Sequence, residues 1–351
     1  MQCWWRAKAW PCAVLMVLMV LMGWVGAAQA QPKSRLTAAD IGLVVNTADP
    51  YSVAVGEYYA RKRGVPANQI VYVQLPVKPT LTAAEFEVLD AQIRSGLGPQ
   101  VLALALAWAQ PYAVECNGIT AAVTLGLDPE ACKQLCAPSK PSPFFNNIAS
   151  KNLAAGGMRP SMLLAARSVE SAQALIDRGV AADQQLGKRG VPPASAVFVA
   201  TQDKARNVRV ALFPSKGAVP ALGLQIERQD AEAATPAHRV ILYQTGTVRE
   251  EHMARIAWLP GALADHLTSY GGQLLTTQGQ MSALDWLEAG ATASYGTVSE
   301  PCNHLQKFPH PQVLLAHYAQ GSTALEAYWR SVAWPAQGVF VGEPLAAPFG
   351  R

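Results

Sequence analysis

The sequence predicts a doubly wound α/β protein in two lobes, with mostly parallel sheets flanked by helices. Three observations predict this class. Apolar runs of strand length alternate with longer amphipathic segments along most of the chain. The run 101–108 is almost entirely apolar, as in a parallel strand buried on both faces. No segment after residue 30 is apolar enough to span a membrane, and no internal repeat occurs.

The first 30 residues have the three parts of a secretory signal peptide. Arg6 and Lys8 supply positive charge, an apolar stretch follows from Ala13 to about Val25, and Ala27-Ala-Gln-Ala30 provides small residues for cleavage. The apolar stretch is short for a membrane-spanning helix, and an uncleaved anchor is the alternative. We expect cleavage after Ala30 and a periplasmic or secreted protein with no membrane span after cleavage.

The net charge limits the partners of the mature chain. The whole chain has 28 Lys and Arg against 24 Asp and Glu, a net charge of +4. Arg6 and Lys8 leave with the signal peptide and no acidic residue does, so the mature charge is about +2. A charge this close to zero, spread evenly, does not predict a nucleic-acid surface. We expect no nucleic-acid partner.

The first strand and helix are predicted by a run of aliphatic residues and the turn that follows it. The run 41–45 is a strand that ends at Asn46-Thr-Ala-Asp-Pro-Tyr-Ser52, a turn rich in helix-capping residues. An amphipathic helix over 53–63 follows, and Gly64 ends it.

The second helix and its flanking strands have equally clear boundaries. The β-branched segment 70–73 predicts a strand. Thr82, with Glu85 at capping-box spacing, begins a helix that runs to about Gly96. The buried strand 101–108 comes next. Strands separated by helices in this way predict a parallel sheet.

The lobes are predicted to be residues 31–160 and residues 161–351. The first ends in an insertion, 127–160, rich in Pro, Ser, Asn and Gly and containing Cys132 and Cys136. This is long for a loop in a compact domain, so we expect disulfides to pin it or a cleft to lie beneath it. A plain surface insertion is the alternative.

The second lobe repeats the alternation of strands and helices. Apolar, β-branched runs predict strands at 161–165, 196–200, 240–243, 291–295 and 339–341. Helical spacing of apolar residues predicts helices at 169–187, 208–214, 281–289, 311–320 and 323–331.

Four cysteines remain after cleavage: Cys116, Cys132, Cys136 and Cys302. An even number in an exported chain predicts two disulfides, and three pairings are possible. The spacing of Cys132 and Cys136 is also compatible with a metal site, but no histidine lies near them in sequence. We therefore expect disulfides, no metal and no cofactor.

Three segments are expected to meet at the carboxyl edge of the second sheet: 245–247, 265–272 and 296–304. The chain has no GxGxxG after a strand, no P-loop and no GxSxG, so common nucleotide and α/β-hydrolase sites are not indicated. Candidate catalytic residues in these segments are His266, Ser269, Cys302 and His304. Candidate ligand-binding residues are Asp265, Glu300, Thr245 and Thr247.

Two nucleophiles can be built from these residues. Cys302 would need an imidazole to lower its thiol pKa, from His266 or His304. A disulfide would remove that chemistry. Ser269 with His266 and Asp265 is the second possibility, although a triad normally converges from different loops. The glycines that follow Ser269 favour a tight turn instead.

Glu300 precedes Pro301 and is therefore held in an extended backbone. It could orient a ligand or act as a general base, or pair with Arg159 or Arg330. The charged stretch Asp203-Lys-Ala-Arg206-Asn-Val-Arg209 is predicted to be a solvated helix start, with a phosphate or sugar-acid contact as the alternative.

Several motifs resemble those of an uncharacterised family of exported bacterial proteins, known by a numbered family model and found in genomes with exosortase-type protein sorting. The resemblance covers nearly the whole mature chain and implies its fold. The matching pieces are Val44-Val-Asn46, Ser52-Val-Ala, Glu57-Tyr-Tyr, Pro111-Tyr before Cys116, Arg159-Pro-Ser-Met-Leu-Leu164, Asp265-His-Leu-Thr-Ser-Tyr-Gly-Gly272, Gly290-Ala-Thr to Glu300-Pro301, Glu326-Ala-Tyr-Trp329 and Val341-Gly-Glu-Pro-Leu345.

The order of elements in the second lobe is also similar to that of gingipain-type cysteine peptidases of the caspase-like fold. In those peptidases, a strand followed by the catalytic histidine precedes a strand followed by the catalytic cysteine. The corresponding neighbourhoods here read Gln244-Thr-Gly-Thr247 and Leu267-Thr-Ser269-Tyr-Gly-Gly272. Neither has the expected residue, and Cys302 lies one strand later.

The resemblance therefore implies a caspase/gingipain-like lobe without the usual catalytic pair. We expect a non-peptidase binding or accessory protein of the cell envelope that holds an envelope or extracellular ligand. The alternative is a hydrolase with a rearranged site that uses Cys302 or Ser269 with His266 or His304.

Overall fold

The computed structural model describes residues 35–350 except 149–156, 234 and 277–278. The predicted signal peptide, residues 1–30, lies outside the described residues. Contacts group the chain from Arg35 onward into one unit, and everything below concerns that unit. Among the residues described, no helix has the length and apolar character needed to cross a bilayer.

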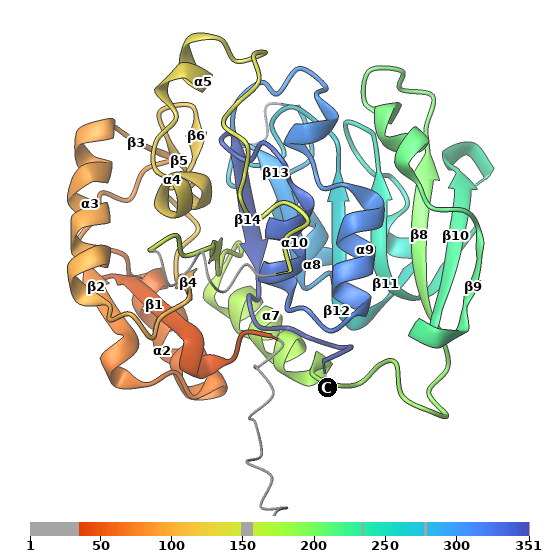
Figure 1. Cartoon of the computed structure of the whole chain (residues 1–351), viewed down its shortest axis with the longest axis horizontal. Helices are drawn as coiled ribbons and strands as arrows, with labels where there is room; N and C mark the ends of the chain where they lie inside the picture. The colour runs from red at the N-terminus through yellow and green to blue at the C-terminus, as the bar shows by residue number, and fades with distance from the viewer. Residues whose placement is uncertain (1–34, 149–156, 234, 277–278, 351) are drawn as a thin grey trace, which may run out of the picture. The chain divides into compact units, whose positions relative to one another are not determined.

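A sheet of eleven strands runs through the described part of the chain (Figure 1). Most neighbouring strands are parallel, which confirms the predicted class, and only β13–β14 and β9–β10 are antiparallel. From one edge to the other the order is β2 (Ile70–Val73), β1 (Ile41–Asn46), β4 (Ala103–Leu106), β7 (Ser161–Leu163), β14 (Gly338–Gly342), β13 (Ala293–Thr297), β12 (Ile256–His266), β11 (Ala237–Thr245), β8 (Ala194–Ala200), β10 (Leu224–Asp230) and β9 (Gly217–Val219).

The sheet crosses the predicted lobe boundary without a break. β4, before residue 160, pairs with β7, after it, and β7 pairs with β14. β11, β12 and β13 are parallel to one another and therefore end at the same edge of the sheet. Strand direction reverses between β13 and β14. The division into two lobes at residue 160 remains a prediction.

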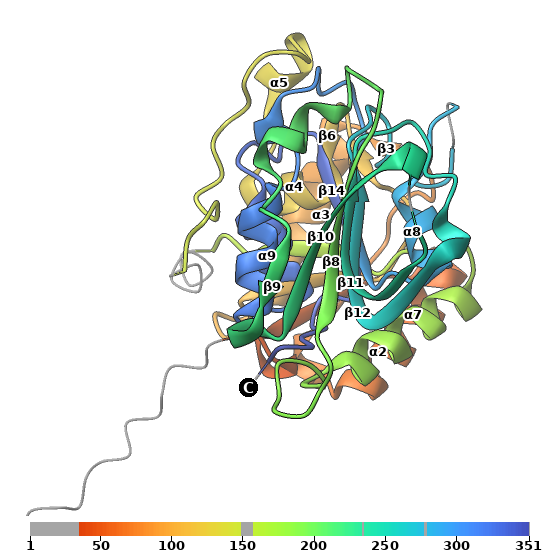
Figure 2. The ribbon, with the colours of Figure 1, turned by 90° about the vertical axis from the view of Figure 1, so that its right-hand side faces the viewer.

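A second, small sheet is formed by β3 (Thr80–Leu81), β5 (Ala113–Val114) and β6 (Asn117–Gly118). Helices cover both faces of the main sheet, and Figure 2 shows α8 on one side of the strands and α9 on the other. The α-helices are α2 (Pro50–Arg63), α3 (Ala83–Gly96), α4 (Ile119–Leu125), α5 (Pro129–Lys133), α7 (Val169–Ala182), α8 (Ala283–Ala289), α9 (Pro311–Ala319) and α10 (Ala324–Ser331). The 3₁₀ helices are η1 (Ala38–Asp40), η2 (Ala67–Gln69), η3 (Asn207–Leu212), η4 (Pro220–Leu222), η5 (Ala231–Ala233), η6 (Met253–Arg255) and η7 (Leu305–Lys307).

Local capping explains where the helices begin and end. Thr82 and Glu85 form the predicted capping box of α3. Asp49 accepts a hydrogen bond from the backbone N–H of Tyr51 and so caps α2, while Gly64 ends that helix with φ 68°. Each such cap is worth about 1 kcal/mol. These boundaries depend on neighbouring residues, and the predicted end of α2 and start of α3 agree with the structure. The start of α2 does not, because the helix begins at Pro50, three residues before the predicted start.

Residue patterns did not predict the long strand β12, because Pro260 and Gly261 interrupt its apolar run. Only the resemblance in the order of elements implied a strand ending near Ser269. Proline and glycine normally interrupt a central strand. Here β11 and β12 shift register between Val240 and Leu242, so an irregularity in the ladder accommodates them. Gly261 itself has φ 88°, a conformation that favours glycine.

Candidate functional site

The three predicted segments lie side by side at one edge of the sheet. Thr245, the last residue of β11, is paired with His266, the last residue of β12. The loop after β12 then packs on β13 so closely that a Cβ on Gly296 would overlap the backbone of Gly271. We call the loop residues at this edge, 246–249, 268–270 and 299–304, the rim.

His266 is enclosed beneath the rim and both of its ring nitrogens are occupied. His266 is 1% exposed. Trp286 donates from Nε1 to His266 Nδ1 at 2.9 Å, so the proton of the neutral ring lies on Nε2, which donates to the carbonyl of Met281 at 3.0 Å. Burial lowers the pKa of His266 to about 3. The ring is therefore neutral and has no free nitrogen for a base or a ligand.

The buried neutral ring makes stability depend on pH. The unfolded histidine has a pKa of about 6.5, and the folded one a pKa of about 3, so between these values only the unfolded chain binds the proton. Stability should therefore fall by up to about 1.4 kcal/mol for each pH unit below 6 because of this residue. His266→Gln should remove that part of the slope, as measured by urea unfolding from pH 4 to 8. An unchanged slope would contradict this assignment.

Asp265 points to the other face of β12 and is buried in an ion pair. Its Oδ1 lies 2.5 Å from Arg209 Nη1, and its Oδ2 accepts from Gln244 Nε2 at 2.8 Å. Arg209 also donates to the carbonyl of Thr245 at 2.7 Å. These side chains are almost fully buried, so the ion pair stabilises the fold and is not part of a binding surface. Asp265 therefore holds η3 against the ends of β11 and β12 and is not open to a ligand.

Ser269 and Thr247 lie on the rim, whereas Thr245 is buried beneath it. Thr247 Oγ1 donates to the carbonyl of Arg249 at 3.0 Å. The carbonyl of Ser269 accepts from Thr297 Oγ1 at 2.9 Å, which fixes the turn backbone. Ser269 and Thr247 are half-buried, so part of each remains accessible to a ligand.

Cys302 is bonded to Cys136, and Cys116 is bonded to Cys132. All four candidate cysteines are therefore paired as the sequence predicted, and the tertiary structure selects one of three pairings. Cys302 has no free thiol for catalysis. The insertion is thereby attached to the rim through Cys136 and to the β5–β6 hairpin through Cys132.

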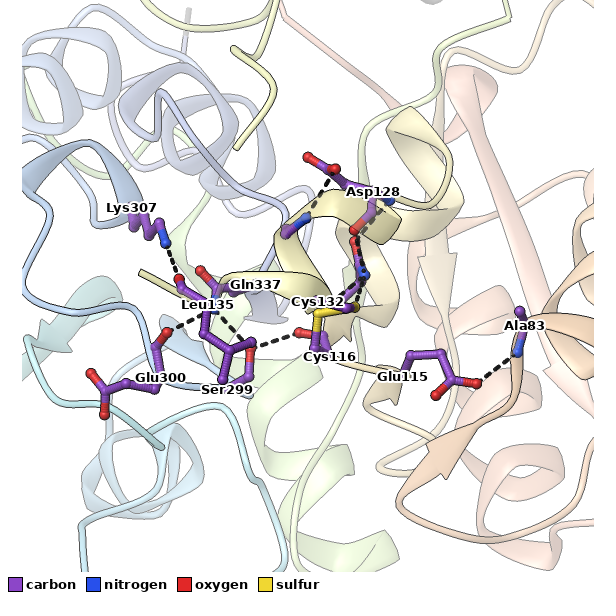
Figure 3. Close-up of a disulfide and its surroundings, with 12 residues drawn as sticks. Ala83, Glu115, Cys116, Asp128, Cys132, Leu135, Ser299, Glu300, Lys307 and Gln337 are labelled. Carbon is purple, nitrogen blue, oxygen red and sulfur yellow. Dashed lines mark hydrogen bonds between the residues drawn. A yellow bond between two sulfur atoms is a disulfide. The ribbon is translucent and has the colours of Figure 1, made fainter. Parts of the chain in front are cut away.

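Figure 3 shows how the residues around the disulfide between Cys116 and Cys132 connect to the rim. Ser299 Oγ donates to the carbonyl of Cys116 at 2.7 Å, and Gln337 Nε2 donates to both Ser299 Oγ and the carbonyl of Glu300. Lys307 is 1% exposed, and its Nζ donates to the carbonyl of Leu135 at 2.6 Å. The pKa of Lys307 is lowered to about 8 by burial. The insertion is thus held by several hydrogen bonds besides its disulfides.

Glu300 and His304 flank Cys302 in this segment. Glu300 Oε1 accepts the backbone N–H of Cys302 at 2.9 Å and so stabilises a turn in which Cys302 has φ 57°. Glu300 pairs with neither arginine proposed above, because Arg159 binds backbone carbonyls and Arg330 binds Glu326. His304 Nε2 lies 2.6 Å from the carbonyl of Cys136. Its orientation is therefore set by the insertion.

Sequence patterns missed a polar chain that joins two loops at the rim. Arg206 donates from Nε to Thr268 Oγ1 at 3.1 Å, and Thr268 donates to Gln280 Oε1 at 2.6 Å. Gln280 also accepts from the backbone N–H of Tyr270. Asp203 pairs with Arg206 at 2.9 Å. This chain links the loop after β8 to the loop after β12.

The stretch predicted as a solvated helix start is the 3₁₀ helix η3, and it is only partly solvated. Arg206 stays partly exposed, but Arg209 is 1% exposed. A signal for this was present: Arg209 lies between Val208 and Val210 in an otherwise apolar run. A charged residue between apolar ones can be buried, and a buried charge needs a partner. In the described residues no group of three or more His, Cys, Asp or Glu could hold a metal ion.

Among solved structures, similar folds include the Arg-specific cysteine proteinase gingipain R, with a TM-score of 0.46 and 11% identity, covering 90% of this chain and 80% of that one. Another, described as "Structure of Protease", has a TM-score of 0.49 and 10% identity, covering 89% and 79%. No protein-family model matches the sequence. No curated protein is significantly similar to it. These similarities concern the fold alone, and membership of the exported family remains a prediction.

Proposed function

We propose that this chain is a non-peptidase binding or accessory protein of the cell envelope, built on a caspase-like scaffold. The observation that carries the proposal is the state of the cysteine and histidine candidates. Cys302 is in a disulfide, both nitrogens of His266 are occupied, and His304 is bound to a backbone carbonyl. A thiolate–imidazole pair, which cysteine peptidases require, cannot form from these groups.

The rim offers a surface for a polar ligand. Thr247 and Ser269 present hydroxyl groups, Glu300 presents a carboxylate and Arg206 a partly exposed guanidinium. Hydroxyl groups donate and accept, so this set suits a ligand with both donors and acceptors. Such a ligand would bind across the ends of β11, β12 and β13, the edge at which open α/β sheets bind ligands.

Two features support a location outside the cytoplasm. Disulfides persist in oxidising compartments, and this chain has two. Residues 1–30 have the pattern of a signal peptide. N-terminal sequencing of the protein from a periplasmic fraction should begin at Gln31. A chain that keeps residues 1–30 and sediments with membranes would contradict this part of the proposal.

The hydrolase alternative makes a different prediction for chemical probes. We expect neither a fluorophosphonate nor iodoacetamide to label the oxidised mature protein, because Cys302 is bonded and no available histidine activates Ser269. Labelling is read by intact-mass spectrometry, with the reduced and unfolded chain as the positive control for thiols. Fluorophosphonate labelling that disappears in Ser269→Ala would establish a serine hydrolase and overturn the proposal.

A further inference from the structure

The edge strand β2 is open to a partner strand. β2 pairs with β1 alone. The N–H of Thr47 donates to the carbonyl of Val73, so Val73 directs its backbone groups toward β1. In a parallel ladder successive residues alternate, and Tyr72 therefore directs its N–H and carbonyl outward. Tyr72 is 63% exposed, and no described strand pairs with the outer edge of β2.

The two edges of the sheet differ in how they are protected, and Figure 1 shows them at opposite ends. The far edge strand β9 has three residues and lies between Lys216 and Pro220. Charge and proline at an edge discourage pairing with another chain. β2 reads Ile-Val-Tyr-Val, without charge, proline or bulge. An unprotected apolar edge of this kind favours pairing with another strand.

An apolar cleft of about 200 Å³ lies beside β2, between the sheet and α2. Tyr72 lines it together with aliphatic residues of β1, β2 and α2, and Glu57 and Arg61 of α2 lie at its outer side. Glu57 and Arg61 are exposed and one helical turn apart. No ion pair joins either of them to another described residue. Arg61 lies over the ring of its neighbour Tyr58, 5.8 Å from the centroid, and apart from this contact the opposite charges at the cleft remain available to a partner.

We propose that the mature chain forms a homodimer in which β2 pairs antiparallel with β2 of a second copy, with the two-fold axis beside Tyr72. Each Tyr72 then exchanges both backbone hydrogen bonds with its counterpart, and the two rings form a cross-strand aromatic pair. The sheets of the two copies become continuous. An isologous contact requires a self-complementary surface. The surface around β2 and α2 is self-complementary, so a second copy fits it.

The charges on α2 provide that self-complementarity. With the axis beside Tyr72, the two β1 strands lie three strand spacings apart, about 14 Å. The two α2 helices then face each other, antiparallel, on the same side of the continuous sheet. In this arrangement Glu57 of each copy is placed to approach the partner's Arg61. The interface is small, as in weak and transient complexes.

Sedimentation velocity of residues 31–351, from about 1 to 200 µM, tests this. We expect a monomer–dimer equilibrium, and Tyr72→Lys should weaken the dimer at least tenfold because it places like charges at the axis. Ala218→Lys, on the protected edge strand β9, is the matched control and should change nothing. Thermal unfolding checks that both variants fold. A chain that stays monomeric at 200 µM, or a dimer that Tyr72→Lys leaves intact, overturns the proposal.

A charge exchange tests the arrangement of the helices. Glu57→Arg and Arg61→Glu should each weaken the dimer, because each places like charges across the axis. The double variant restores opposite charges and should return the Kd to within about threefold of the original. If the double variant associates no better than the single ones, α2 does not face its copy and the proposed geometry is wrong.

Discussion

Replacing Asp265 with alanine is expected to lower the free energy of unfolding by about 3 to 5 kcal/mol. The substitution leaves the Arg209 guanidinium enclosed without its carboxylate, since the two side chains are 2% and 1% exposed. Gln244 also loses the acceptor of its Nε2 hydrogen bond. The loss is measured by urea unfolding at neutral pH, followed by circular dichroism.

Two further variants separate the buried charge from a general effect of truncation. Asp203→Ala removes the partner of Arg206 in a partly exposed pair and the acceptor of the Ala205 and Arg206 backbone N–H groups, and should cost about 1 to 2 kcal/mol. Combining Arg209→Met with Asp265→Leu removes both buried charges, and should recover much of the loss of Asp265→Ala. If Asp265→Ala costs no more than Asp203→Ala, the buried pair does not hold η3 to the rim.

Removing the disulfide between Cys136 and Cys302 is expected to destabilise the chain by about 3 to 5 kcal/mol. The bond joins residues 166 apart in sequence, whereas the bond between Cys116 and Cys132 joins residues 16 apart. A longer closed loop restricts the unfolded chain more, so the shorter bond should contribute about 3 kcal/mol or less. Urea unfolding of the two double-alanine variants, under oxidising conditions, compares them directly.

The disulfide between Cys136 and Cys302 should also order the rim more than the disulfide between Cys116 and Cys132 does. It connects the insertion to Cys302, whose N–H donates to Glu300, and His304 Nε2 lies against the carbonyl of Cys136 itself. Hydrogen exchange of residues 299–304 should therefore increase when Cys136 and Cys302 are both replaced by alanine, and remain unchanged when the short disulfide is removed. The reverse order of the two effects would contradict the role assigned to the long bond.

Both predictions concern residues that sequence patterns marked as functional. Asp265 and His266 follow one another at the end of β12, so their side chains point to opposite faces of the sheet. Elements far away in sequence decide what each one meets: Arg209 from η3, and Trp286 from α8. The sequence can predict that a polar residue lies near the end of a strand. Its partners and its pKa depend on tertiary packing, which the local sequence does not contain.

The rim itself was partly predictable. Parallel strands end at one edge, so the meeting of the segments after β11, β12 and β13 followed from the order of elements. The chain from Arg206 through Thr268 to Gln280 was not predicted, because its members lie in loops that have no periodic pattern. The pairing of Cys136 with Cys302 was equally beyond reach, since an even cysteine count allows any pairing.

The amino-acid sequence by itself determined the α/β class, the starts of helices such as α3 and the presence of two disulfides. These depend on spacing, on capping groups a few residues apart and on a count. The tertiary structure alone decided that one sheet runs through both halves of the chain, that Pro260 and Gly261 lie inside a strand and that Cys302 is bonded. It also decided which polar side chains remain at the surface, because exposure is a property of what packs against a residue.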